Sequence, residues 1–250
     1  MRVPKANNGA KIITSAGAAV NFKSTTVSSS AGAAGGLAGT MAFDTKLQTD
    51  GTAAITLTSM TIEGGTAAGG VSGKVDNVTS ENLNGNVKVV EPSVGGSRSG
   101  AQAGGFIGNY TLNKEVVEND QTLPDKVVIN APTVFVHGSQ SPGGGNAGGY
   151  FGILNLQGAI QYTIGNSEEN NKFQFRSTYK EKGGNAEGYG AIAGQLTTSA
   201  KESTLLIQNF KVTSKFTSGS DRPRYHGGLI GRTGDDTESK ATYLEVKMWR

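Results

Sequence analysis

Apolar and polar residues alternate along this chain in short segments, each bending near its middle. Alternation with a period of two predicts half-buried β-strands, and the Val, Ile, Thr, Phe and Tyr of these segments fit a pleated surface. Pro92 and Pro132 stand at two of the bends, where a residue without an amide proton is tolerated. The pattern predicts an all-β protein. The segments read VNFKSTTVS, ITLTSMTIEG, VKVVEPSVGG, VVINAPTVFVHG, FQFRSTYKEKG and LLIQNFKVTSKF.

A glycine motif recurs between these segments in the form Gly-Gly-apolar-x-Gly. A degenerate copy, GAIAG, begins at Gly190 and carries Ala191 in place of the second glycine. Recurrence at a spacing of this size predicts a repeat architecture, in which glycine allows backbones to approach closely. The predicted structural glycines are Gly35, Gly36, Gly39, Gly69, Gly70, Gly73, Gly104, Gly105, Gly108, Gly148, Gly149, Gly152, Gly190, Gly194, Gly227, Gly228 and Gly231.

One such unit cannot bury its own apolar face, whereas stacked units share a continuous core. We expect three short parallel strands and one coil per repeat, one strand at the glycine motif and one on each side of the bend. Residues 1–250 are predicted to form a single right-handed parallel β-helix (a β-solenoid) of about six irregular coils. The repeats begin near residues 35, 69, 104, 148, 190 and 227, after an N-terminal partial coil over 10–34.

Two neighbouring positions after the paired glycines are both apolar in several repeats, as at Phe106 and Ile107. Neighbouring strand residues point to opposite faces, so the strand at the motif is expected to be apolar on both sides. Two interpretations stay open: long loops cover its outer face, or the face is a hydrophobic strip for a partner.

Binding of a phosphate or a cofactor by the glycine motif is not expected. No helical pattern follows any copy, and neither G-x-x-x-x-G-K-S/T nor the context of a dinucleotide fold is present. A cofactor is bound once, whereas a packing requirement recurs in every coil. We therefore predict no cofactor.

Composition excludes further classes. The chain has no cysteine, only two histidines, a net charge of +3 and no basic run, so neither a disulfide framework nor nucleic-acid binding is expected. His137 and His226 are too far apart in the sequence to suggest a metal site, and none is predicted. No apolar run reaches the length of a membrane-spanning helix, and the first residues lack the apolar core of a signal peptide.

The motifs GGLAG, GGFIG, GGYFG and GGLIG, each followed by a β-rich segment, resemble the GLUG-type repeats of bacterial surface and secreted proteins. The resemblance covers residues 31–250 as an array. It implies an extracellular β-solenoid within an adhesin-like or filament protein at the cell surface, and it implies no catalytic residues.

An enzyme acting on polysaccharides is the alternative, because parallel β-helices host such lyases and hydrolases. Arg222, Pro223 and Arg224 partly resemble the arginine motif of pectate lyases. Asp235 and Asp236 are adjacent and would point oppositely in a strand, unlike the paired carboxyls of glycosidases. The favoured prediction is a non-enzymatic structural or adhesive protein.

Polar loops are the expected contact points for a glycan or host-surface ligand, since binding residues concentrate on loops of rigid scaffolds. The candidate contacts are Tyr110, Tyr179, Tyr225, Arg222 and Arg224. The strand-like run near the C-terminus, TYLEVKMWR, carries no evident cap, and uncapped edges invite another chain. We expect either further solenoid in the same polypeptide or end-to-end self-association.

Overall fold

The computed structural model describes most of the chain, and every regular element in it is a β-strand. The all-β prediction is confirmed, and the strands pair in parallel. The described residues are 11–15, 17–42, 45–49, 53–78, 87–90, 92–96, 98, 100–113, 127–130, 136–141, 144–164, 173–179, 188–198, 203–208, 210–216, 225–234 and 243–247.

Three parallel sheets of six strands each dominate the fold. Sheet I contains β3 (Thr26–Ser29), β8 (Thr61–Gly64), β12 (Ser93–Gly96), β16 (Val136–Ser141), β20 (Phe173–Tyr179) and β24 (Phe210–Phe216). Sheet II contains β4 (Ala33–Gly35), β9 (Ala67–Gly69), β13 (Ala101–Gly104), β17 (Gly144–Gly148), β21 (Gly188–Gly190) and β25 (Tyr225–Gly227). Sheet III contains β5 (Ala38–Ala42), β10 (Ser72–Asp76), β14 (Ile107–Asn113), β18 (Phe151–Gln157), β22 (Ala193–Thr198) and β26 (Ile230–Thr233).

Three smaller parallel sheets complete the described part of the chain. Sheet IV contains β2 (Ala19–Lys23), β7 (Ala54–Thr58) and β11 (Val87–Val90). Sheet V contains β15 (Val127–Asn130), β19 (Ile160–Ile164), β23 (Thr204–Gln208) and β27 (Tyr243–Lys247). Sheet VI pairs β1 (Lys11–Thr14) with β6 (Lys46–Thr49).

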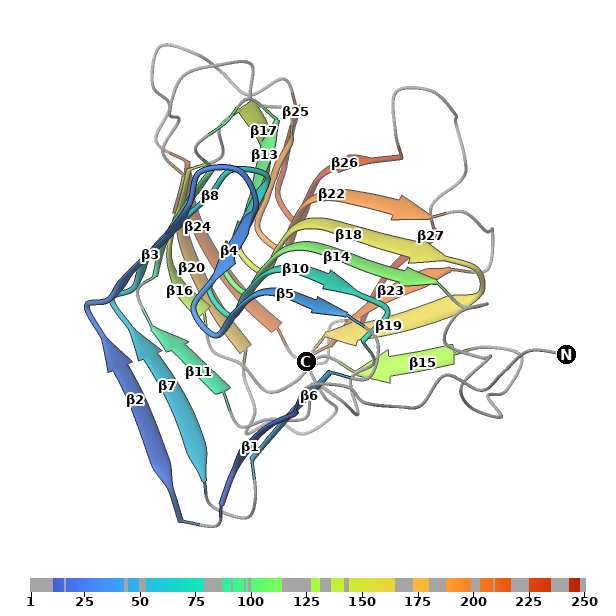
Figure 1. The fold of residues 1–250 in the computed structure, drawn as a ribbon. Coiled ribbons are helices and arrows are strands. Elements are labelled where there is room, and N and C mark those ends of the chain that lie inside the picture. Colours follow the sequence, from blue (N-terminus) through green and yellow to red (C-terminus); the bar gives the residue numbers. More distant parts are fainter. Residues whose placement is uncertain are drawn as a thin grey trace, which may run out of the picture.

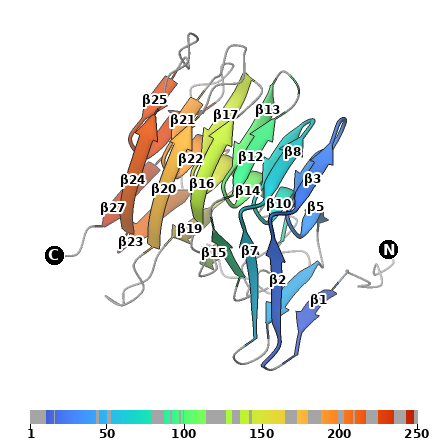
Figure 2. The same ribbon diagram turned by 90° about the vertical axis from the view of Figure 1, so that its left-hand side faces the viewer.

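The chain passes through sheets I, II and III in the same order six times, and we call each passage a round. Figure 2 shows the strands of sheet I side by side in chain order, from blue β3 to red β24. The first glycine of each motif pairs with the first glycine of the next round, from Gly35 and Gly69 through to Gly190 and Gly227. One round therefore corresponds to one motif.

The expected three strands per repeat are corrected to at least four among the described residues, because a strand of sheet IV or V precedes each strand of sheet I, and β1 and β6 of sheet VI add a fifth in the first two rounds. The glycine motif is not one strand but the junction of two. The segment FQFRSTYKEKG is corrected as well: it contributes the single strand β20, and β19 occupies the position before the bend. Because polar sequence separates β19 from β20, the sequence pattern did not indicate that the two strands belong to the same round.

The bend between sheets IV and I has a local cause in the first two rounds. Ser24 and Ser59 lie between the strands of the two sheets and both have φ of 51°, in the left-handed region, which departs from extended backbone and so bends the chain between the two strands. Their amides donate to the next round, Ser24 N to Thr58 O at 3.0 Å and Ser59 N to Val90 O at 2.8 Å. Stacked left-handed residues thus fix this bend.

Figure 1 shows how the sheets are arranged along the stack, and one cluster of buried hydrophobic residues includes side chains from all six rounds. Its middle is aromatic, and its ends are aliphatic. In rounds one and six the core residues Val20, Val27, Leu37, Ala38, Leu229 and Ile230 are only partly buried.

Candidate functional site

The six glycine motifs form one continuous feature, the corner between sheets II and III. In each motif the first glycine ends a strand of sheet II, and the residue after the apolar position begins a strand of sheet III. Figure 1 shows β4 descending into this corner and β5 leaving it. We call this feature the glycine corner.

The first glycine of every motif faces a backbone oxygen of its own round. A Cβ placed there would lie between 1.5 and 2.1 Å from the carbonyl oxygen three residues ahead, as at Gly104, where Ile107 O is 1.8 Å away. Real side-chain carbons do not approach oxygen so closely, so only glycine allows this fold of the chain.

The third glycine serves contact between rounds. A Cβ at Gly108 would lie 2.6 Å from Ala68 O, and one at Gly194 would lie 2.5 Å from Ala147 N, both in the preceding round. The second glycine behaves similarly in the early rounds, since a Cβ at Gly36 would lie 2.4 Å from Gly70 O. Backbone contact at these distances leaves no room for a ligand.

Two successive amides share one carbonyl at the glycine corner, which turns two consecutive side chains inward. Phe106 N and Ile107 N both donate to Tyr150 O at 3.0 Å, and Tyr150 N and Phe151 N both donate to Ile192 O. The register stays one to one across the corner, with Gly104 opposite Gly148 and Ile107 opposite Phe151, so the alternation of faces is interrupted at the same place in both rounds. The same pairing occurs at the other corners between adjacent rounds.

Phe106 and Ile107 are therefore both in the core, each 1% exposed. The expectation of an apolar outer face at this position is wrong, and neither a covering loop nor a partner strip is needed there. The rule that neighbours point oppositely holds within a strand, but these two residues stand on either side of a corner.

Three tyrosines lie in the aromatic part of the core. Tyr110, Tyr150 and Tyr162 are fully buried, and the Tyr110 and Tyr162 rings meet edge to face at 5.7 Å. Burial raises the pKa of all three phenols well above the ordinary value, with the nearby Tyr110 charge as a smaller cause at Tyr150 and Tyr162. The interior stabilises their neutral form.

Tyr110 was expected to be a loop contact for a ligand, and this expectation is corrected. It lies in β14, and its hydroxyl donates to the backbone oxygen of Val78 inside the molecule. The alternation of β14, with buried residues at every second position, directs Tyr110 inward. It cannot reach a glycan.

Sequence reasoning missed a polar cluster that links sheets II and III across four rounds. We define it as Gln102, Asn146, Gln195 and Arg232. Asn146 N donates to Gln102 Oε1 at 2.7 Å, while Asn146 Nδ2 and Arg232 Nη2 both donate to Gln195 Oε1 at 3.0 Å. Gln195 Nε2 donates to Gly234 O at 2.7 Å.

Asn146 and Gln195 are 1% and 4% exposed. The cluster contains amides and a guanidinium but no carboxylate, so it supplies no general acid or base near neutral pH. Its members lie about 40 residues apart in the sequence, and no local motif marks them. Its chemistry is that of buried polar packing between rounds.

Replacing Gln195 with Leu is expected to lower the free energy of unfolding by about 1–3 kcal/mol, because buried donors of Asn146 and Arg232 lose their acceptor. Urea denaturation followed by circular dichroism measures this. Gln161→Leu, on the half-buried side of β19, is the matched control and should shift stability by less than about 0.5 kcal/mol. Equal shifts in both variants would contradict a buried role for the cluster.

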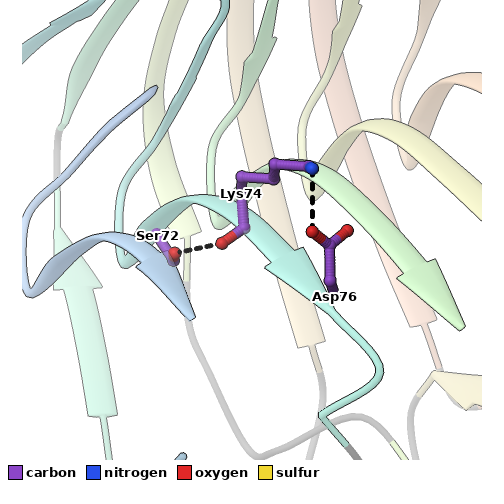
Figure 3. Close-up of polar contacts among 3 residues, drawn as sticks. All are labelled: Ser72, Lys74 and Asp76. Carbon is purple, nitrogen blue, oxygen red and sulfur yellow. Dashed lines mark hydrogen bonds and ion pairs between the residues drawn. The ribbon is translucent and has the colours of Figure 1, made fainter. Parts of the chain in front are cut away.

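In the second round of sheet III, the buried Ser72 and the more exposed Lys74 and Asp76 form a small polar group. Figure 3 shows Ser72 Oγ donating to Lys74 O at 2.9 Å and Lys74 Nζ pairing with Asp76 Oδ2 at 2.8 Å. The Lys74 and Asp76 side chains are 45% and 26% exposed. An ion pair this exposed contributes at most about 1 kcal/mol and holds no pocket.

The remaining candidate contacts are only partly described. Tyr225 is half-buried at the start of β25, whereas Arg222 and Arg224 lie outside the described residues, as do Asp235 and Asp236. Tyr179 ends β20 and His137 lies in β16. The side chains of both residues lie outside the described part of the structure. Of these candidate side chains, the described part of the chain includes Tyr225 alone.

His226 lies in β25 and is exposed, with its ring 5.7 Å from that of Tyr189. Partial desolvation lowers its pKa from the ordinary value.

Among the described residues no three His, Asp or Glu side chains are grouped closely enough to hold a metal ion. The described part of the chain also contains no helix of the length and apolarity that crossing a membrane requires.

No family model, curated protein or solved structure matches this chain.

Proposed function

We propose that this chain is a right-handed parallel β-helix that serves as a non-enzymatic stalk or adhesive rod in a bacterial surface or extracellular filament protein. One observation carries the proposal: the first glycines of all six motifs stack in register, one motif to a round. Parallel strands that return to the same three sheets in each round form an elongating stack with a continuous core.

The geometry of the motif supports the same interpretation. Backbone atoms occupy the space that a Cβ would take at the first glycine of each round, so the motif is used in packing. The resemblance of GGFIG and GGLIG to GLUG-type repeats supports placement at the cell surface. On this proposal, any adhesive contact with a glycan or host surface belongs to the loops between rounds.

A comparison of binding with turnover tests the proposal against the enzyme. The purified chain is incubated with acidic and neutral polysaccharides, with and without Ca²⁺, while new reducing ends and unsaturated products are measured. The same glycans and host matrix proteins are probed with chain-coated beads. We expect no products above the blank and retention of the beads on at least one surface.

Turnover that Arg222→Ala or Arg224→Ala abolishes would overturn the proposal in favour of a polysaccharide-acting enzyme. Beads retained on no surface, together with no turnover, would remove adhesion and leave only the stalk. A solved structure in which the strands form a compact sandwich would remove the stalk as well.

A further inference from the structure

The first and last rounds have complementary edges. Among the described residues, β3, β4 and β5 are the outermost strands of sheets I, II and III on one side, and β24, β25 and β26 are outermost on the other. Outermost strands present unpaired backbone groups that can pair with another chain. Because every internal pairing in these sheets is parallel, both edges have the geometry of the same ladder.

The hydrogen bonds at the glycine corner show which edge presents donors and which presents acceptors. In each of the first five rounds, the two residues after the paired glycines (Gly190-Ala191 in the fifth) donate both amides to one carbonyl of the next round. Ile192 N and Ala193 N, for example, donate to Leu229 O at 2.9 and 3.4 Å. By this pattern the amides of Leu229 and Ile230 face outward on the last round. The carbonyl of Leu37 faces outward on the first.

The apolar side chains that follow the paired glycines form a column through the rounds, and this column is incompletely buried in the first and last rounds. Phe106, Tyr150 and Ile192 in the inner rounds are at most 1% exposed, whereas Leu37 and Leu229 in the same column are only partly buried. Phe22, on the first-round edge in β2, is 39% exposed, as the single large exposed hydrophobic side chain among the described residues. A further round on either edge would bury Leu37 or Leu229, whereas Phe22 belongs to sheet IV, to which the last round contributes no described strand.

The space beside Gly228, in the last round, is also unfilled. A Cβ at Gly36 or Gly70 would lie 2.4 or 2.1 Å from a carbonyl oxygen of the next round, whereas a Cβ at Gly228 would meet nothing within 4 Å. No described part of this chain occupies the space beyond Gly228. A partner there must bring three parallel strands at the angles of sheets I, II and III, and the first round of the same chain has them.

We propose that copies of this chain stack head to tail, with the last round of one copy pairing in register with the first round of the next. The inference rests on the parallel β-helix of the proposed function and names its partner, a second copy of the chain. The contact is heterologous, so it continues into a filament. Leu229 N and Ile230 N donate to Leu37 O of the next copy.

The proposal fixes a register that cysteine pairs can test, because the native chain has no cysteine. In sheet I one column contains Thr26, Thr61, Ser93, Ser139, Thr178 and Lys215. Stacking places Lys215 of one copy beside Thr26 of the next, with Cα atoms about 4.8 Å apart, within the range of a disulfide. Within one copy the two positions are separated by five strand spacings, about 24 Å.

The experiment uses the full chain with Thr26→Cys and Lys215→Cys under mild oxidation, analysed on non-reducing gels. We expect a ladder of covalent oligomers. The matched control is Ser28→Cys with Lys215→Cys, since Thr26 and Ser28 are both exposed on the same face of β3. Its Cα atoms would be about 8 Å apart in the stack, too far for a disulfide, so at least tenfold less ladder is expected.

A blocking variant removes chance cross-linking as an explanation. Gly228→Val, added to the Thr26→Cys and Lys215→Cys pair, fills the open space beyond the last corner and should suppress the ladder. Thr111→Val, on the inner strand β14, should not. Circular dichroism confirms that each variant keeps its β-structure.

Equal ladders from both cysteine pairs, or no ladder from either, would overturn the proposed stacking. A chain that remains monomeric in sedimentation velocity with intact β-structure would also overturn it, while leaving the stalk of the proposed function untouched. The proposed function would instead be contradicted by polysaccharide turnover or by a different fold. Failure of the stacking proposal and failure of the proposed function are therefore distinguishable.

Discussion

Gly104→Ala is expected to lower the free energy of unfolding by at least about 3 kcal/mol. The new Cβ would lie 1.8 Å from Ile107 O, 2.5 Å from Ile107 C and 2.7 Å from Gly152 N, all of them backbone atoms. Overpacking against side chains typically costs about 1–3 kcal/mol. Here a backbone must move, and moving it disturbs the shared hydrogen bonds to Tyr150 O.

Urea denaturation followed by circular dichroism measures the loss, with Gly228→Ala as the matched control. The control makes the same chemical change at the second glycine of the last motif, where the new Cβ meets nothing within 4 Å. Its stability should therefore stay within about 0.5 kcal/mol of the native chain. If Gly104→Ala were as stable as Gly228→Ala, the packing role of the first glycine would be wrong.

The second large effect is expected at alkaline pH, where the chain should unfold cooperatively between about pH 11 and 13. Tyr110, Tyr150 and Tyr162 have pKa values raised by burial in the folded state, whereas in the unfolded state they ionise near the ordinary value of 10. The stability that their neutral form contributes is present below pH 10. It is lost as pH rises above 10, because only the unfolded state releases the protons.

The magnitude follows from the number of groups. Each buried tyrosine reduces the free energy of unfolding by about 1.4 kcal/mol per pH unit above 10, so the three together remove about 4 kcal/mol per unit. A folded protein typically has a stability of about 5–15 kcal/mol. For a stability of up to about 12 kcal/mol, one to three pH units above 10 therefore suffice to unfold the chain.

Absorbance of tyrosinate near 295 nm, recorded together with circular dichroism, tests this expectation. The buried phenols should ionise at the pH at which the β-signal disappears. Tyr162→Phe removes one of the three groups, so the loss of stability per pH unit should fall by about one third. Ionisation of all seven tyrosines before any loss of β-signal would contradict the buried, neutral state.

Local sequence features predicted the strands and the repeat. Alternating Val, Ile and Thr predicted all-β structure, and the glycine motif predicted the register of one round on the next, as the pairing of Gly104 with Gly148 shows, although the motif was expected to be a strand and is the junction of two. These were predictable because each depends on a backbone requirement within a few residues. The clash that excludes a Cβ at Gly104 comes chiefly from Ile107, three positions away.

Side-chain environments could not be predicted in the same way. Phe106 and Ile107 were expected on opposite faces, yet both enter the core because their amides share Tyr150 O, more than 40 residues ahead. Tyr110 looked like a surface aromatic beside a polar stretch, but its hydroxyl pairs with Val78 O of the preceding round. Each outcome depends on a contact between rounds.

The sequence by itself determined the β-class of this protein, the six glycine motifs and the alignment of one motif with the next, whereas the structure showed that each motif is a corner between two strands. Only the tertiary structure decided how many strands make a round, which aromatic residues are buried, and that Asn146 meets Gln195. The physical reason is the range of the interactions. A corner is set by steric contacts within one motif, whereas burial and polar pairing depend on which residue of a neighbouring round lies beside it, 32 positions away for Tyr110 and Val78 and 49 for Asn146 and Gln195.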